Sequence, residues 1–563
     1  MTVVKQIIVR FGLLMALSLS LGSSWLHAQE PNSENPAPDQ YAVSISAEVK
    51  VLFQELVAAS LRDKSKILKQ LDQHSGREML PMFEAMLNGE LYYQPDGLQL
   101  YQVKENASGN AVAYSVFGGE LVDGLSIKKF KKVRVNNSLR KQLRNSIARI
   151  QLLYGEESER KAAAETMLSA MSDSAVALFQ EAREKETVKE VQQLLDVGLA
   201  MNTVSTSVDS TERVAAIRAL SSRLELPVKN LLMRLMDKNS DGEFKEADPL
   251  VRSAAESALK DIDGRIAYYG LLEKLFFGLS LGSVFLLAAI GLAITFGVMG
   301  VINMAHGEMI MLGAYTTYVV QLLMPNHLEW TILVAIPAAF LVSGSVGVLI
   351  ERSVIRFLHG RPLETLLATF GISLILQQLV RTIFSPLNRQ VSTPDWLSGS
   401  IELNPIFSLT YNRLSILIFS LIVFGLLMLV MKKTSLGLNV RAVSQNRDMA
   451  RAMGIKTERV DSMTFGLGSG IAGVAGVALS QLTNVGPNLG QSYIIDSFMV
   501  VVFGGVGNLL GTLVGSFSLG VANKFLEPAT GAVLANIIIL VFIILFIQKR
   551  PKGLFPQKGR AAE

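Results

Sequence analysis

The pattern of apolar positions divides the chain into two parts near residue 270. Before that point, charged and apolar residues are mixed as in a water-soluble domain. Beyond it, apolar stretches approach or exceed the roughly 20 residues that a helix needs to cross a bilayer. These stretches cover residues 271–299, 304–323, 331–350, 364–384, 414–431, 463–482, 488–526 and 533–547. The pattern predicts an all-α polytopic membrane domain over residues 271–548 and a separate domain over residues 42–270.

The stretch 488–526 is too long for one crossing, because at about 1.5 Å per residue it would extend nearly twice the hydrocarbon thickness. Glycines and Asn508 interrupt it, so we divide it, which gives about nine crossings. Lys and Arg gather after the third and fifth stretches and in the basic tail, residues 549–563. Because such loops stay in the cytoplasm, this bias places the tail inside and the domain before the first crossing outside.

The first residues have the layout of a secretory signal. Lys5 and Arg10 precede the apolar run 11–21, and small residues lead to a predicted cleavage site after Ala28. Cleavage after Ser24 and an uncleaved anchor are the alternatives. We therefore expect a signal peptide at residues 1–28 and a disordered, proline-rich linker at residues 29–41. The protein is then a multi-pass protein of the bacterial inner membrane, with residues 29–270 in the periplasm.

The periplasmic domain is predicted to be mostly α-helical. Residues 91–135 alternate between apolar and polar positions in short runs, which predicts a small β meander. Three later segments share a pattern of an arginine, two alanines and an apolar residue, at Arg160–Met167, Arg213–Leu220 and Arg252–Leu259. Small residues on one helix face allow close packing, and a recurrence of about 40 residues is typical of HEAT-like repeats.

Composition excludes some classes of site and partner. The chain has no cysteine, so disulfides, thiolate metal sites and cysteine nucleophiles are impossible. The net charge of +5 is modest and reflects membrane orientation rather than a nucleic-acid surface. One weak calcium-loop candidate consists of Asp237, Asn239, Asp241 and Asp248, but Lys245 lies inside it and the usual bidentate Glu is missing. We therefore predict no metal site.

Polar residues inside the apolar stretches are the candidates for a translocation pathway. Asn303, His306 and Glu308 lie at the glycine-rich junction between the first two stretches, Gln377 lies near the end of the fourth, and Asn508 follows the later glycine run. Ionisable groups within a membrane are costly unless paired, so they are functional candidates. The alternative is that Asn303 and His306 hold the helix junction together and contact no solute.

A basic, amphipathic loop after the fifth stretch has the character of a docking helix. Its candidate residues for coupling to an ATPase are Arg441, Ala442, Ala450, Gly454 and Ile455. The alternative is a solvated basic loop on an anionic membrane face. The sequence contains no G-x-x-x-x-G-K-[ST] motif, so ATP and Mg are expected only on partner subunits, and this chain is expected to bind no cofactor and to be no enzyme.

Three segments resemble the permease family of binding-protein-dependent ABC importers for branched-chain amino acids and urea. GVINMAHGEMIMLGAY is similar to the first-span signature of the family, AVSQNRDMARAMGI to its ATPase-coupling segment, and VVFGGVGNLLGTLVG to its late glycine-rich motif. The resemblance covers residues 275–556 and is strongest to urea permease subunits. It implies a second permease subunit, two cytoplasmic ATPase subunits and a periplasmic solute-binding protein as partners, in addition to the lipid bilayer.

Together these features predict the permease of an ABC importer. The chemistry of the polar residues leaves urea and an amino acid open as the solute, and the resemblance implies urea. Within the same class, the alternative is a branched-chain amino acid or a short amide. A passive channel or secondary carrier is the alternative of another class, and it would need no docking helix. A sensor or scaffold anchored by its spans would need fewer crossings and no glycine-broken helices.

Overall fold

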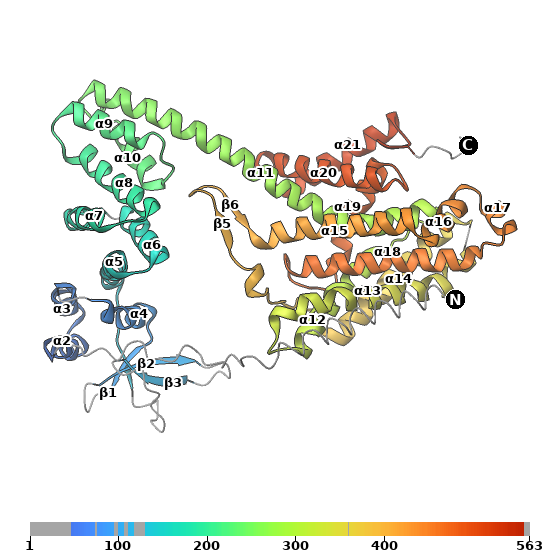
Figure 1. Cartoon of the computed structure of the whole chain (residues 1–563), viewed down its shortest axis with the longest axis horizontal. Coiled ribbons are helices and arrows are strands. Elements are labelled where there is room, and N and C mark those ends of the chain that lie inside the picture. The colour runs from blue at the N-terminus through green and yellow to red at the C-terminus, as the bar shows by residue number, and fades with distance from the viewer. Residues whose placement is uncertain are drawn as a thin grey trace. The chain divides into compact units, whose positions relative to one another are not determined.

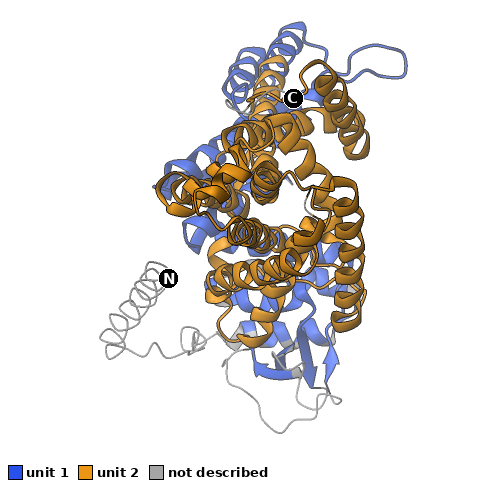
Figure 2. Ribbon diagram, turned by 90° about the vertical axis from the view of Figure 1, so that its right-hand side faces the viewer, with its two compact units in different colours: residues 1–259 blue, residues 260–563 orange. Residues whose placement is uncertain are grey.

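The computed structural model describes residues 47–73, 76–94, 99–105, 111–116, 130–169, 171–358 and 360–556. The chain forms two compact units, residues 1–259 and 260–563 (Figure 2). The predicted signal peptide, the linker and the tail beyond residue 556 lie outside the described residues. The 51-residue helix α11 (Pro249–Met299) contributes to both units. Residue 270, where the composition changes, is therefore not a helix end.

Unit 1 is mostly helical, with a small sheet near its start (Figure 1). Its helices are α2 (Ala47–Ala58), α3 (Leu61–Gln73), η2 (Arg77–Met79), α4 (Leu80–Asn88), α5 (Asn137–Tyr154), α6 (Glu157–Leu168), α7 (Asp173–Lys185), α8 (Lys189–Thr206), α9 (Ser210–Leu220) and α10 (Leu226–Leu235). One core joins α2–α5 to the sheet, with Phe53 and Phe83 fully buried within it. The HEAT-like assignment of α5–α10 stays a prediction.

The sheet has four antiparallel strands in the order β3-β2-β1-β4. The strands are β1 (Leu91–Gln94), β2 (Gln99–Glu105), β3 (Ala111–Ser115) and β4 (Lys131–Lys132). Tyr101 of β2 lies opposite Tyr92 of β1 and Ser115 of β3. All four strands lie within the region where alternating residues predict strands, and the last one pairs with β1 rather than with β3.

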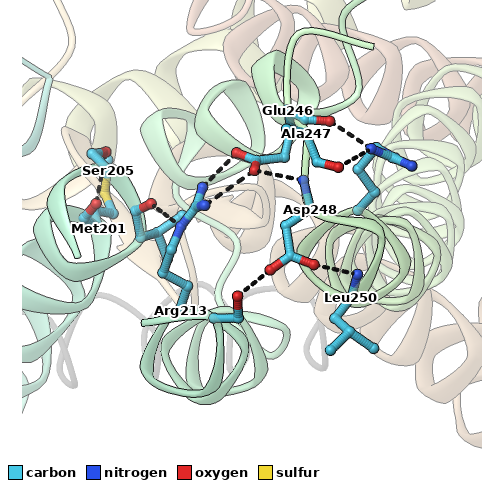
Figure 3. A network of polar contacts seen from close by, with 10 residues as sticks. Met201, Ser205, Arg213, Glu246, Ala247, Asp248 and Leu250 are labelled. Carbon is cyan, nitrogen blue, oxygen red and sulfur yellow. Dashed lines mark hydrogen bonds and ion pairs between the residues drawn. The ribbon is translucent and has the colours of Figure 1, made fainter. Parts of the chain in front are cut away.

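The arginines of the repeated segments bind the turns beside them. Arg160 donates to Glu186 at 2.7 Å and to the Gly155 carbonyl at 2.9 Å. Arg213 similarly donates to both oxygens of Glu246, at 2.5 and 3.1 Å, and to the Val204 carbonyl (Figure 3). Each guanidinium therefore joins its own helix to a loop about 30 residues further along the chain.

Unit 2 consists almost entirely of long helices (Figure 1). After α11 come α12 (His306–Leu323), α13 (Leu328–Ser353), η4 (Ile355–Leu358), α14 (Pro362–Phe384), η5 (Asp395–Leu397), β5 (Ser400–Glu402), β6 (Ser408–Thr410), α15 (Tyr411–Lys433), α16 (Ser435–Gln445), α17 (Arg447–Ala452), α18 (Thr457–Ser480), α19 (Leu489–Gly504), α20 (Leu509–Thr530) and α21 (Ala532–Lys549). The long apolar stretch 488–526 is thus broken at residues 505–508.

Seven helices in the described ranges are long and apolar enough to cross a membrane, namely α11, α13, α14, α15, α18, α20 and α21. The 16-residue α19 is shorter, and α12 does not belong to this group. The count of nine crossings therefore stays a prediction, which requires α12 and α19 to cross as well.

Helix α18 is the central element of unit 2, and glycines let its neighbours approach its backbone. A Cβ on Gly313 of α12 would lie 1.9 Å from the Gly473 carbonyl oxygen of α18. A Cβ on Gly476 would lie 2.0 Å from the Ile310 carbonyl oxygen of α12, and one on Gly473 would lie 2.6 Å from the Ala339 carbonyl oxygen of α13. No other residue fits at such distances, so these glycines set the spacing of α12, α13 and α18.

We expect Arg213→Ala to destabilise the α9 region of unit 1 by about 2 kcal/mol, because it leaves a largely buried carboxylate without its charged partner. Hydrogen bonding to Arg213 lowers the pKa of Glu246. The stabilisation is therefore present at neutral pH and is lost as the pH falls through that lowered pKa. Hydrogen exchange of residues 204–250 measures the loss. Lys245→Ala is the control, since its ion pair with Asp237 is about half exposed on both sides.

We expect Gly313→Ala to destabilise the purified protein in detergent by about 1–3 kcal/mol, which is the typical effect of overpacking a dense interior. The melting temperature should fall accordingly. Gly425→Ala, in the middle of α15, is the matched control because a Cβ there has no atom within 4 Å. Equal melting temperatures for the two variants would show that α12 and α18 are not in backbone contact.

Candidate functional site

The site begins at the break between α11 and α12. Gly300 has a φ of 67° and turns the chain after α11. The Asn303 Oδ1 accepts a hydrogen bond from the Ala305 amide at 3.0 Å, and its carbonyl accepts one from the His306 amide at 3.3 Å. Asn303 is buried, and its Nδ2 has no partner among the described residues. The side chain therefore shapes the junction and retains one unused donor.

His306, the first residue of α12, joins α12 to α11. Its ring is fully buried, and its Nε2 lies 2.9 Å from the Ala288 carbonyl oxygen. Because a carbonyl only accepts, Nε2 carries the proton, and Nδ1 is left as an acceptor without a partner in the described part of the chain. Gly291 makes room for the ring, since a Cβ there would lie 2.8 Å from the His306 Cε1.

Glu308 faces α14 instead of α11. Two residues along a helix are separated by about 200°, so Glu308 and His306 lie on nearly opposite faces of α12. The Glu308 Oε1 accepts hydrogen bonds from Ser373 Oγ at 2.9 Å and from Gln377 Nε2 at 2.7 Å. Its Oε2 is buried and makes no hydrogen bond to any described residue. The structure thus joins Glu308 to Gln377 and separates both from His306.

Helix α14 presents a polar stripe to this carboxyl group. The stripe consists of Thr365, Thr369, Ser373 and Gln377, which recur every fourth residue and are at most 6% exposed. Thr369 Oγ1 accepts a hydrogen bond from the Met304 amide at 3.1 Å, beside the junction. Sequence reasoning singled out only Gln377; the four-residue recurrence of polar side chains in an apolar helix was the signal for the other three.

Asn508 has a different role from the other candidates. Its Oδ1 accepts from the Gly511 amide at 3.1 Å and so caps α20. Its Nδ2 donates to the Phe555 carbonyl at 3.1 Å, which fixes the segment after α21 to the α19–α20 turn. Both the oxygen and the nitrogen of this side chain are thus hydrogen-bonded at the turn. Among the described residues, no hydrogen bond links Asn508 to Glu308, Ser373 or Gln377.

The basic loop after α15 forms two short helices, α16 and α17, where the sequence suggests one. Asn446 separates them and caps α17 by accepting from the Met449 amide at 3.0 Å. Arg441 donates to the Met431 carbonyl at the end of α15. The alanines of the predicted coupling set point inward: Ala450 is buried in a small apolar core, and Ala442 packs against that core.

Gly454 ends α17 in a left-handed conformation, with a φ of 83°. The Ile455 amide bonds back to the Ala450 carbonyl at 3.0 Å, and the Ile455 side chain packs on the same apolar core. This is the arrangement of a Schellman motif. The outer surface of the segment instead carries Leu438, Met449 and Met453, which are 61%, 61% and 79% exposed. These three residues were not among the sequence candidates.

Two of the four calcium-loop candidates, Asp237 and Asp248, bind other protein groups through their side chains. Asp248 accepts from Ser210 and from the Leu250 amide at the start of α11 (Figure 3). Asp237 pairs with Lys245 at 3.3 Å, and Asn239 makes a backbone turn with Glu243. Over the described ranges, no group of three or more His, Cys, Asp or Glu residues is arranged to hold a metal ion.

Comparisons with known proteins match the membrane part of the chain. Residues 274–547 match the family described as "Branched-chain amino acid transport system / permease component". The high-affinity branched-chain amino acid transport system permease protein BraD of Pseudomonas aeruginosa is 30% identical over 297 residues, which are 51% of this chain and 96% of that protein.

A second relative, the high-affinity branched-chain amino acid transport system permease protein LivH of Salmonella typhimurium, is 30% identical over 50% of this chain and 94% of its own length. The probable branched-chain amino acid transport permease protein LivH of Methanocaldococcus jannaschii is 26% identical over 52% of this chain and 91% of its own. No solved structure matches the chain.

We expect Gln377→Leu to destabilise the protein by about 1–3 kcal/mol, because it removes the shorter of the two hydrogen bonds to a buried carboxyl group. Gln378→Leu makes the same chemical change at the next position, which is exposed, and should leave stability nearly unchanged. Thermal unfolding in detergent compares the two. A larger loss for Gln378→Leu would contradict the assigned orientation of α14.

Proposed function

This chain belongs to the branched-chain amino acid transport system permease family, and from that membership we propose that it is the membrane-spanning subunit of a binding-protein-dependent ABC importer. It is a multi-pass membrane protein with seven candidate spans. Under the proposal, it works with a second permease subunit, two cytoplasmic ATPase subunits and an external solute-binding protein. ATP and Mg are then bound by the ATPase subunits, and this chain contributes no catalysis.

The observation that carries the proposal is the buried polar contact between α12 and α14. The stripe from Thr365 to Gln377 extends over about 18 Å of α14, more than half of a hydrocarbon layer of about 30 Å. Glu308 is 1% exposed and lies next to the stripe residues Ser373 and Gln377. The hydroxyls of Thr365 and Thr369 donate to backbone carbonyls, whereas the Glu308 carboxyl is costly to bury, and such a group within a membrane is a candidate for a solute pathway.

The α16–α17 segment supplies the expected contact with the ATPase. It pairs a buried apolar core with exposed apolar residues, Leu438, Met449 and Met453, and the segment also carries the exposed basic residues Arg441 and Arg451. Exposed apolar residues among charges are typical of a docking surface. Under the proposal this face enters a groove of the ATPase, and the alternative of a solvated basic loop does not account for the exposed methionines.

We assign urea as the solute. Its carbonyl and two amino groups need several hydrogen-bond partners once water is removed. The polar seam, which we define as Glu308 of α12 with Thr365, Thr369, Ser373 and Gln377 of α14, offers hydroxyl, amide and carboxyl groups. The assignment also rests on the similarity of this sequence to urea permease subunits. A branched-chain amino acid is the second candidate, favoured by the names of the relatives; its ammonium group would pair with Glu308.

Unit 1 is proposed to be periplasmic and to help dock or orient the solute-binding protein. This placement follows from the predicted signal peptide and from the distribution of Lys and Arg among the loops. The stacked helices α5–α10 present a broad surface of the kind that helical arrays use for protein binding. The family match begins at residue 274, so this role is specific to the longer chain.

We expect deletion of the gene to abolish ATP-dependent uptake of labelled urea at low concentration, while leucine uptake persists. Complementation with the unchanged chain should restore urea uptake, and Glu308→Ala at equal expression should leave it about tenfold lower. Loss of leucine uptake with urea uptake intact would establish the amino-acid alternative. Uptake that survives ATP depletion would instead indicate a passive channel or a secondary carrier.

A further inference from the structure

The core beneath the coupling segment reaches the helices of the transport bundle. Its buried residues are Val440, Val443, Ala450 and Val460, and Val298 of α11 packs against them. Val298 is two residues before the turn at Gly300 that leads to Asn303. The coupling segment therefore contacts the end of α11 next to the polar junction and the first turns of α18.

A largely buried ion pair connects the same segment to α18. The first residue of α17, Arg447, donates to both oxygens of Asp461, in the second turn of α18, and the Nη1–Oδ1 distance is 3.3 Å. The side chains are 24% and 4% exposed. A bidentate contact between a guanidinium and a buried carboxylate fixes both the distance between the two side chains and their relative orientation, because two parallel hydrogen bonds prevent rotation.

Helix α18 is in turn fixed to the helices that carry or flank the polar seam. Next to Asp461, Ser462 donates to Glu351 of α13, and both residues are buried. Further along α18, Gly473 and Gly476 lie against the backbone of α12, which carries Glu308. A shift of the first turns of α18 must therefore move α12 and α13, since contacts at this spacing leave no room for sliding.

We propose that the Arg447–Asp461 pair is the latch through which movement of the coupling segment is transmitted to α18 and from there to the Glu308 seam. The latch rests on the proposed importer function and adds a positioning role for two residues outside the predicted coupling set. Neither residue contacts solute or ATP. Their role is to make α17 and α18 move as one body when the ATPases close.

A second ion pair in the same region serves as a control. Arg356, in η4, pairs with Glu458 in the first turn of α18. It has the same charges and also ends on α18, but its side chains are 46% and 61% exposed. Exposed pairs hold geometry weakly. The pair also connects α18 to η4, which lies outside the α16–α17 segment, so breaking it should not uncouple transport.

The test uses the complete transporter reconstituted in vesicles, with ATP hydrolysis and uptake of labelled urea or leucine measured in the same preparation. We expect Arg447→Ala to lower the solute moved per ATP hydrolysed by about tenfold while hydrolysis continues. The exchanged pair Arg447→Asp with Asp461→Arg should restore part of that ratio, and Arg356→Ala should leave it unchanged. An unchanged ratio for Arg447→Ala overturns the latch.

If the Arg447→Ala transporter does not assemble, a cross-link between the same two positions tests the proposal. The chain has no native cysteine, so Arg447→Cys with Asp461→Cys can be joined by a short bis-maleimide. The cross-linked transporter should be coupled and the unlinked double variant uncoupled; equal coupling ratios overturn the latch. If the unmodified transporter takes up neither solute on adding ATP, the proposed function fails, which is a different outcome from a coupled transporter without a latch.

Discussion

Backbone contact between α18 and its neighbours is the constraint on which the rest of unit 2 depends. Helices in a bilayer gain little from hydrophobic association, because lipid tails are as apolar as the side chains, so close packing must stabilise the bundle. Gly313 and Gly473 allow α12 and α18 to approach until a methyl group no longer fits between them. Helix α18 is consequently buried over most of its length, whereas α15 and α21 keep apolar surfaces open for lipid or for a partner.

The same contact explains how polar groups can remain within an apolar bundle. With α12 held against α18 on one face, its other faces are directed at α11 and α14. His306 and Glu308 occupy those two faces, and each finds a partner there, in the Ala288 carbonyl and in Ser373 with Gln377. The other Glu308 oxygen has no hydrogen-bond partner in the described part of the chain, so burying it costs free energy that the close packing of the bundle must offset. The glycine packing and the buried polar contacts are therefore parts of a single arrangement.

Unit 1 is held together by a different interaction. Its helices are short, and two of the three repeated arginines form ion pairs with loops, Arg160 with Glu186 and Arg213 with Glu246, whereas Arg252 donates to the Glu246 and Ala247 carbonyls. The exposed fractions of the paired side chains range from 4% to 21%, so the pairs lie between the core and the surface. Such pairs fix the angles between successive helices and hence the surface that the stack presents. This is the property required of a domain that positions another protein.

Features that depend on neighbouring residues could be predicted from the sequence alone. The apolar stretches, the break near residue 505, the polar junction around Asn303 and the basic segment ahead of Gly454 all follow from local composition and spacing. Which helix faces meet became evident only in the folded chain. The tertiary structure separated His306 from Glu308, added Ser373 and Thr369 to Gln377, gave Asn508 a capping role and paired Arg447 with Asp461. These outcomes depend on contacts between helices far apart in the chain, whose rotation is set by glycine packing against backbone, and the periodicity of a single helix does not encode its partner.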